Sequence, residues 1–159
     1  MLHFAYGANM SRKVMRRYAP GAQPLGAAQL AGYRFFISAD GYASLAPCPA
    51  QMVHGVVWRL TARDRVMLDG WENVAAGLYR AQVLPVRLQG RRIPALVYLA
   101  RPGGEGRAKP GYVELVIAAG RQWHLPDDYI QALECWLTAG RLASPMLARG
   151  SAAKIGEFG

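Results

Sequence analysis

Residues 52–60 read Met-Val-His-Gly-Val-Val-Trp-Arg-Leu, and this stretch predicts the fold more clearly than any other part of the chain. It is rich in β-branched and aromatic residues, which favour β-strands. The apolar residues are nearly continuous instead of alternating, which indicates a strand that is buried on both faces. The protein is therefore expected to be built around a sheet with this strand at its centre.

A helix is expected directly after this strand. Thr61 and Asp64 have the spacing of a capping box, in which each residue's side chain bonds the backbone of the other. The predicted helix covers residues 62–69, ends at Gly70, and buries Val66 together with Met67 or Leu68.

Further strands are expected on either side. Residues 2–6 and 29–38 are short apolar or aromatic runs bounded by glycines. Residues 78–88 and 92–100 are expected to pair as a hairpin that turns at Gly90, with Pro94 at an edge or a bulge because proline cannot donate to a central strand.

Helices dominate the rest of the chain. Ser11 is placed to cap a short helix over residues 12–18. Residues 101–110 are rich in glycine and proline and predict a loop, after which the apolar positions recur with a helical period. Pro126 followed by two aspartates suits the start of a last helix. This order predicts an α+β fold with a single domain over residues 1–140 and a flexible tail over residues 141–159.

The chain has 159 residues and a net charge of +9, which raises the question of nucleic-acid binding. The basic residues are mostly arginines spread along the chain. Their densest groups lie at residues 12–17 and 91–92, and neither is interleaved with the aromatic residues of a stacking platform. Binding to nucleic acid is thus the less favoured reading, and no apolar run has the length of a membrane span.

Two short motifs carry the candidate chemistry. Tyr6-Gly7-Ala8-Asn9 follows the first strand and has the composition of a turn that aims backbone N–H groups at an anion, with the Asn9 side chain fixing the turn. Glu72 follows Trp71 in a largely apolar setting, which suits a carboxyl group for proton transfer. The alternatives are an ordinary turn for the loop, and a solvated glutamate or an ion pair with Arg80 for Glu72.

The two motifs, taken in order with residues 55–58 between them, resemble the γ-glutamylcyclotransferase family. The loop resembles the family's Tyr-Gly-Ser-Asn loop, and Glu72 falls at the family's spacing from Gly77 and Tyr79. The chain is more similar to the branch that acts on γ-glutamyl amino acids than to the glutathione-specific branch. It departs from the pattern at Ala8, where the family has serine, and at Asn73, where glycine is frequent.

The resemblance implies a small mixed β-barrel flanked by helices and a cytoplasmic enzyme that needs no cofactor or metal. It implies release of 5-oxoproline from a small γ-glutamyl substrate, with Glu72 as general acid and base. The implied substrate-binding residues are Tyr6, Gly7, Ala8, Asn9, Tyr79 and Tyr112. Residues 38–45 and 101–110 are expected to wall the pocket.

Two questions stay open at this point. The protein could be a non-catalytic binding module of the same fold. If it is an enzyme, the sequence does not determine which amine is attached to the glutamyl group of the substrate. The sequence also leaves open whether the chain forms a homodimer. The three histidines, His3 among them, are interpreted as structural, and the two cysteines as free thiols.

Overall fold

The computed structural model describes residues 1–138, and a barrel of strands forms the centre of this part of the chain. The strands are β1 (Leu2–Ala5), β2 (Gln23–Ile37), β3 (Ala43–Arg59), β4 (Tyr79–Leu88) and β5 (Arg91–Ala100). They close in the order β1-β3-β2-β4-β5. Neighbours are antiparallel except β1 and β5, which meet in parallel where His3 faces Leu96. The expected mixed barrel is thus confirmed, while the predicted tail lies outside the described residues.

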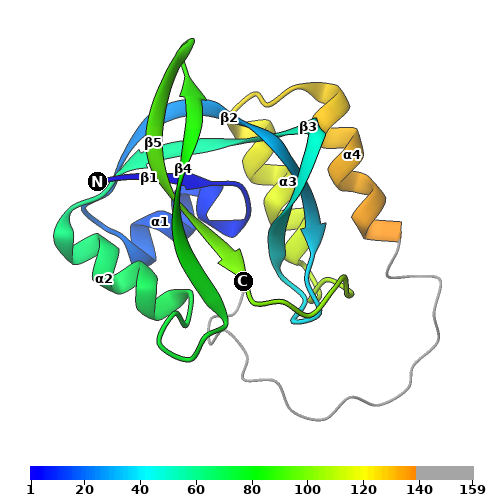
Figure 1. Ribbon diagram of the computed structural model, residues 1–159, viewed down its shortest axis with the longest axis horizontal. Coiled ribbons are helices and arrows are strands. Elements are labelled where there is room, and N and C mark those ends of the chain that lie inside the picture. Colours follow the sequence, from blue (N-terminus) through cyan, green and yellow to red (C-terminus); the bar gives the residue numbers. More distant parts are fainter. Residues whose placement is uncertain (139–159) are drawn as a thin grey trace.

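Helices cover the barrel on two sides (Figure 1). They are a 3-10 turn η1 (Ala8–Met10), α1 (Arg12–Tyr18), α2 (Ala62–Trp71), α3 (Tyr112–Gln122) and α4 (Asp127–Thr138). The last helix packs on the long β2–β3 pair through contacts of Trp136 with Phe35 and of Tyr129 with His54. None of the helices within residues 1–138 has the length and hydrophobicity needed to cross a membrane.

The predicted helix caps are present. The Ser11 side chain accepts the N–H of Val14, and Thr61 and Asp64 form the full capping box. The predicted end and buried face of α2 are partly wrong. Gly70 stays helical, so α2 continues to Trp71 and Glu72 becomes its C-cap. Val66 is 71% exposed, and the buried apolar residues of the helix are Leu68 and Trp71.

The β2–β3 pair is longer than expected, because both strands begin before their predicted starts. Glycines and prolines interrupt the pattern there. Gly26 and Gly32 have φ angles of 131° and 81°, and the register shifts next to each of them. Only glycine adopts such angles without strain, so the two irregular points bend the strand without ending it.

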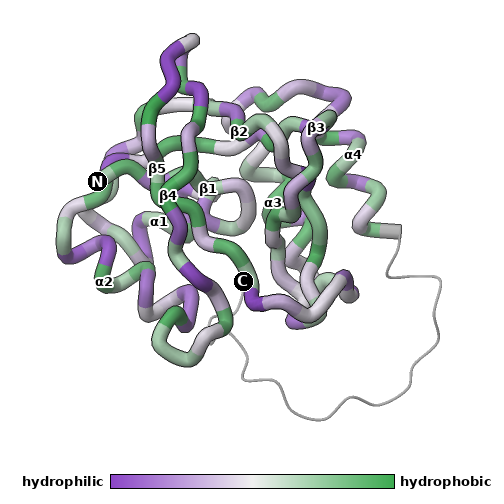
Figure 2. The backbone as a smooth tube through the Cα atoms, viewed as in Figure 1, coloured by the Kyte–Doolittle hydropathy of each residue, from purple (hydrophilic) through white to green (hydrophobic). Residues whose placement is uncertain are grey.

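Strand β3 lies between β1 and β2, and residues 55–58 are buried on both faces as predicted, whereas Met52 is 44% exposed and His54 is half-buried. Val53, Val56 and Val57 are 0% exposed and Trp58 is 3% exposed. Figure 2 shows the apolar residues along the barrel strands and the polar residues toward the tip of the β4–β5 hairpin. The backbones of β1 and β3 come very close at Gly55, where a Cβ atom would lie 2.2 Å from the Ala5 carbonyl oxygen.

A Gly55→Ala variant should therefore be strongly destabilised. The added methyl group would also meet the Phe4 ring at 2.8 Å, so two strands have to separate. Overpacking costs about 1–3 kcal/mol in the free energy of unfolding, which urea unfolding measures, and a backbone clash at 2.2 Å places this variant at the upper end of that range. Gly70→Ala is the matched control, because no atom lies within 4 Å of that position and alanine favours a helix. Equal stability of the two variants would show that β1 and β3 are not held this close.

Candidate active site

The loop after β1 is a tight turn that places Gly7 and Asn9 inside the protein. The Met10 N–H donates to the Gly7 carbonyl at 3.0 Å, and the Ser11 N–H donates to the Ala8 carbonyl at 2.9 Å. These bonds define η1, whose residues are all buried. Because α1 begins immediately afterwards at a capped residue, the turn is fixed from both ends.

The space around position 7 requires glycine. A Cβ atom there would lie 2.7 Å from the Tyr112 hydroxyl oxygen and 3.1 Å from Cβ of Ala43. The Tyr112 hydroxyl accepts the Ala43 N–H at 3.2 Å and also hydrogen-bonds the backbone of Ala8. The loop backbone and the first residue of α3 are therefore in direct contact.

The Glu72 side chain lies next to the loop of residues 6–9, at the C-terminal end of α2. It is only 4% exposed, and its Oε1 accepts a hydrogen bond from Nδ2 of Asn9 at 2.8 Å. This corrects the expectation that the Asn9 side chain fixes its own turn. The alternative of an ion pair with Arg80 is also wrong, because the Arg80 guanidinium bonds Gln82. A buried carboxyl group is thus held in position by the loop.

Two tyrosines hold the backbone of Ala43, at the start of β3, from opposite sides. The Tyr79 hydroxyl donates to the Ala43 carbonyl at 2.7 Å, while the Tyr112 hydroxyl accepts the N–H of the same residue. Burial raises the pKa of both tyrosines above the ordinary value. Both therefore remain neutral at physiological pH and act through hydrogen bonds, not through charge.

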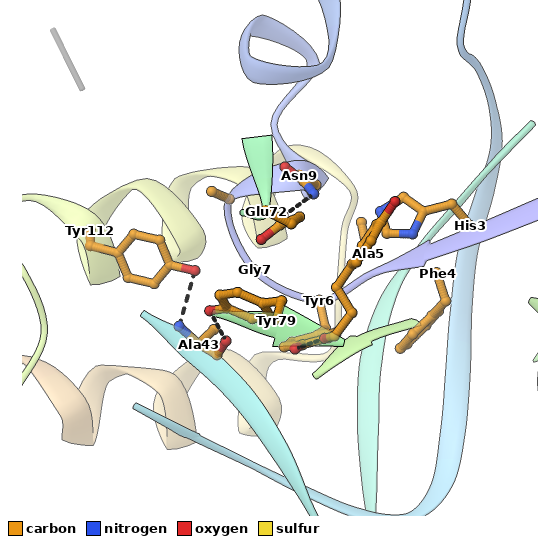
Figure 3. A pocket seen from close by; sticks show the side chains of 12 residues that line it. His3, Phe4, Ala5, Tyr6, Gly7, Asn9, Ala43, Glu72, Tyr79 and Tyr112 are labelled. Carbon is orange, nitrogen blue, oxygen red and sulfur yellow. Dashed lines mark hydrogen bonds between the residues drawn. The ribbon is translucent and has the colours of Figure 1, made fainter. Parts of the chain in front are cut away.

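These elements enclose one cavity (Figure 3). All seven residues that the sequence predicts for the site line it, and so do several that it did not predict. The lining residues are His3, Phe4, Ala5, Tyr6, Gly7, Ala8, Asn9, Ala43, Glu72, Tyr79, Tyr98 and Tyr112. The cavity volume is about 30 Å³, and the cavity is partly open to solvent. None of the lining residues is lysine or arginine.

The expected pocket walls are only partly present. Ala43 of the predicted residues 38–45 lines the cavity, but residues 101–110 do not. That loop lies against the turn between β2 and β3, where the Gly106 N–H donates to the Ile37 carbonyl at 2.8 Å. A Cβ atom at Gly106 would lie 2.5 Å from the Ser38 carbonyl oxygen, so this loop is packed closely against that turn.

Two polar lining residues, His3 and Tyr98, were missed because their partners are remote in sequence. The Tyr98 hydroxyl donates to Asp69 at 2.7 Å, and the Tyr98 carbonyl accepts the Tyr6 hydroxyl. The period of two along a strand is the one signal that could have indicated His3, because it places His3 and Ala5 on the same face of β1.

His3 is fully buried where the barrel closes. Its Nδ1 lies 3.0 Å from the carbonyl oxygen of Leu96 on β5. A carbonyl group only accepts, so Nδ1 carries the proton and Nε2 has the lone pair. Burial lowers the pKa of His3 to about 4, so the ring is neutral at physiological pH. The structural role predicted for His3 is thus present, and the ring also lines the cavity.

Known proteins share this sequence pattern and this fold. The family model described as "Gamma-glutamyl cyclotransferase, AIG2-like" matches residues 3–124. The chain is 25% identical over 144 residues to the gamma-glutamylcyclotransferase of Homo sapiens, covering 84% of this chain and 77% of that protein.

Solved structures with this fold include one titled "Gamma-glutamyl cyclotransferase". It matches with a TM-score of 0.79 and 22% identity, over 96% of this chain and 93% of that chain. A yeast γ-glutamyl cyclotransferase specific to glutathione matches with a TM-score of 0.53 and 13% identity, over 89% and 97% of the two chains. At these identities the two structures establish similarity of the fold.

The contact between Gly7 and Tyr112 gives a prediction for a pair of variants. Gly7→Ala should lower the melting temperature because the methyl group overlaps the Tyr112 hydroxyl. Tyr112→Phe in the same chain removes that hydroxyl and should recover part of the loss, although Cβ of Ala43 stays close. A double-mutant cycle on the free energies of unfolding measures the coupling, expected at about 1 kcal/mol. Strict additivity of the two changes would contradict the contact.

The neutral state of His3 gives a prediction for the pH dependence of stability. The pKa is about 4 in the folded protein and 6.5 in the unfolded chain. As the pH falls from about 6.5 to about 4, the unfolded chain binds a proton that the folded protein does not, so stability decreases by up to about 3 kcal/mol. The slope of unfolding free energy against pH should be smaller in His3→Gln. An unchanged slope would show that His3 is not buried in its neutral form.

Proposed function

Because the chain belongs to the gamma-glutamyl cyclotransferase, AIG2-like family, we propose that it is an enzyme that releases 5-oxoproline from a γ-glutamyl amide. The observation that carries this proposal is the buried carboxyl group of Glu72, held by Asn9 in a cavity that the loop of residues 6–9 also lines. A family fold by itself would not specify a reaction, whereas a buried and positioned carboxyl group supplies proton transfer.

The proposed reaction takes place within one substrate molecule. The α-amino nitrogen attacks the γ-carbonyl carbon, a new C–N bond closes a five-membered ring, and the amide C–N bond breaks. The attacking ammonium group loses two protons, and the departing amine gains two. No serine or cysteine nucleophile is required, because the substrate supplies its own. The protein's main task is orientation, which in well-ordered intramolecular reactions corresponds to effective concentrations of roughly 10⁵–10⁸ M.

Glu72 is the group that moves these protons in our proposal. A carboxylate accepts a proton from the ammonium group, returns one to the leaving amine, and repeats the transfer. The hydrogen bond from Asn9 fixes Oε1, and the position of Glu72 at the end of α2 fixes its backbone through the bond of its N–H to the Leu68 carbonyl at 2.8 Å. The carboxylate can thus stay in place while the substrate changes from open chain to ring.

The loop backbone is proposed to hold the glutamyl group. Position 8 is alanine, so its side chain offers no hydroxyl group and the contacts have to come from N–H groups. The backbone of Ala8 is hydrogen-bonded to the Tyr112 hydroxyl. We therefore expect the substrate to compete with Tyr112 for this loop on binding, while Tyr79 stays on Ala43 as part of the wall.

A Glu72→Gln variant should lose roughly 100- to 10,000-fold in the rate of 5-oxoproline release, the usual contribution of general acid–base catalysis. Glutamine keeps an oxygen that can accept the Asn9 hydrogen bond, so the fold and ligand binding should be retained. The assay measures 5-oxoproline from γ-glutamyl amino acids, γ-glutamyl amines and a γ-glutamylated biosynthetic intermediate, since the departing amine is not specified.

Glu114→Gln is the matched control for this experiment, because Glu114 is an exposed glutamate in the first turn of α3 and does not line the cavity. Its activity should equal that of the wild type. Turnover near the wild-type rate in Glu72→Gln would refute the assigned role of Glu72. No release of 5-oxoproline by the wild type from any of the three substrate types would refute the proposed function.

A further inference from the structure

Two buried atoms on residues that line the cavity have no hydrogen-bond partner within residues 1–138. They are Nε2 of His3 and Oδ1 of Asn9. A buried polar atom without a partner costs about 1–3 kcal/mol, and proteins rarely retain one without a reason. Both atoms belong to residues that line the same cavity, which points to a ligand group as their missing partner.

Both unpartnered atoms are hydrogen-bond acceptors. His3 has its proton on Nδ1, which faces the Leu96 carbonyl, so Nε2 has only a lone pair. Asn9 donates through Nδ2 to Glu72, so its remaining atom is the carbonyl oxygen. The Glu72 carboxylate is a third acceptor at the same cavity, and no lysine or arginine lines it. In the view of Figure 3, Glu72 and Asn9 stand between Tyr112 on the left and His3 on the right.

Three acceptors around a cavity without basic residues fit a ligand group that only donates. A carboxylate or phosphate group would meet lone pairs and a negative charge. A primary ammonium group has three N–H donors and a positive charge, which matches one donor to each acceptor and offsets the buried carboxylate. The chemistry of the wall therefore selects a primary ammonium group.

We propose that His3 and Asn9, together with Glu72, form the subsite for the substrate's α-ammonium group, and that Nε2 of His3 determines specificity for it. The proposal rests on the proposed function, because a γ-glutamyl amide has such a group at the nitrogen that attacks. His3 and Asn9 accept hydrogen bonds from two of the three N–H groups of the ammonium group, which directs the third N–H toward the Glu72 carboxylate. Histidine at position 3 is then a positioning residue and not only a support for barrel closure.

The test compares two ligands that differ only in the amino group. L-glutamate and glutarate are titrated into the protein by calorimetry, and the ratio of their dissociation constants measures recognition of the ammonium group. The ratio is measured in the wild type and in His3→Phe and His3→Leu, which lack the acceptor. We expect the wild type to prefer glutamate, and this preference to fall about tenfold in the His3 variants. Melting curves identify which of the two variants folds.

His3→Gln and His54→Phe are the matched controls. Glutamine again offers an acceptor oxygen, so it should restore part of the preference. His54 is a half-buried histidine beside Tyr129 that does not line this cavity, so its replacement should leave the preference unchanged. An unchanged preference in a folded His3→Phe or His3→Leu variant, or an equal loss in His54→Phe, would overturn the inference.

The two proposals fail in different ways. If the wild type releases 5-oxoproline but the His3 variants keep the preference for glutamate, the subsite is wrong and the enzyme assignment stands. If the wild type prefers glutamate and loses that preference without His3, but releases no 5-oxoproline from any γ-glutamyl amide, the subsite stands and the reaction is wrong.

Discussion

The close approach of β1 to β3 at Gly55 is the constraint on which the rest of the site depends. There is no room for a side chain between Gly55 and the Ala5 carbonyl, so the first strand lies directly on the central one. The loop of residues 6–9 begins at the next residue and is therefore carried to a fixed point at the end of the barrel. Glu72 lies beside this loop at the end of α2, and α2 is tied to the turn before β2 by the hydrogen bond from the Gly21 N–H to Asp64.

Several groups that line the cavity both stabilise the fold and form part of the site. Asn9 positions a carboxylate with its amide nitrogen and also lines the cavity, and the backbone N–H and carbonyl groups of Ala43 bond two tyrosines. His3 joins β1 to β5 and lines the same cavity. Since each group has a structural partner as well as a place in the site, most substitutions there will change stability and ligand binding together.

Local signals in the sequence were sufficient for the helix caps and the strand at residues 53–58, while the grouping of the loop with Glu72 came from the family resemblance. Local signals were insufficient where contacts between residues remote in sequence determine which side chains are buried and which ones meet in the site. The apolar Val66 was expected to be buried, but the helix turns Leu68 and Trp71 inward instead. The long β2 strand was hidden by glycines that bend it without ending it. His3 and Tyr98 could not be assigned to the site because their partners, Leu96 and Asp69, are brought near only by barrel closure and by α2.

The hydrogen bond between Asn9 and Glu72 joins residues 63 positions apart in the chain. Neither residue has any local reason to meet the other, so the bond can form only after β1, β3 and α2 have docked. Closing so long a loop costs conformational entropy, so contacts of this range form more slowly than the local contacts of helices and hairpins. A chain with native helices and hairpins but without docking of these elements would lack the site, which makes the site itself a reporter of complete folding.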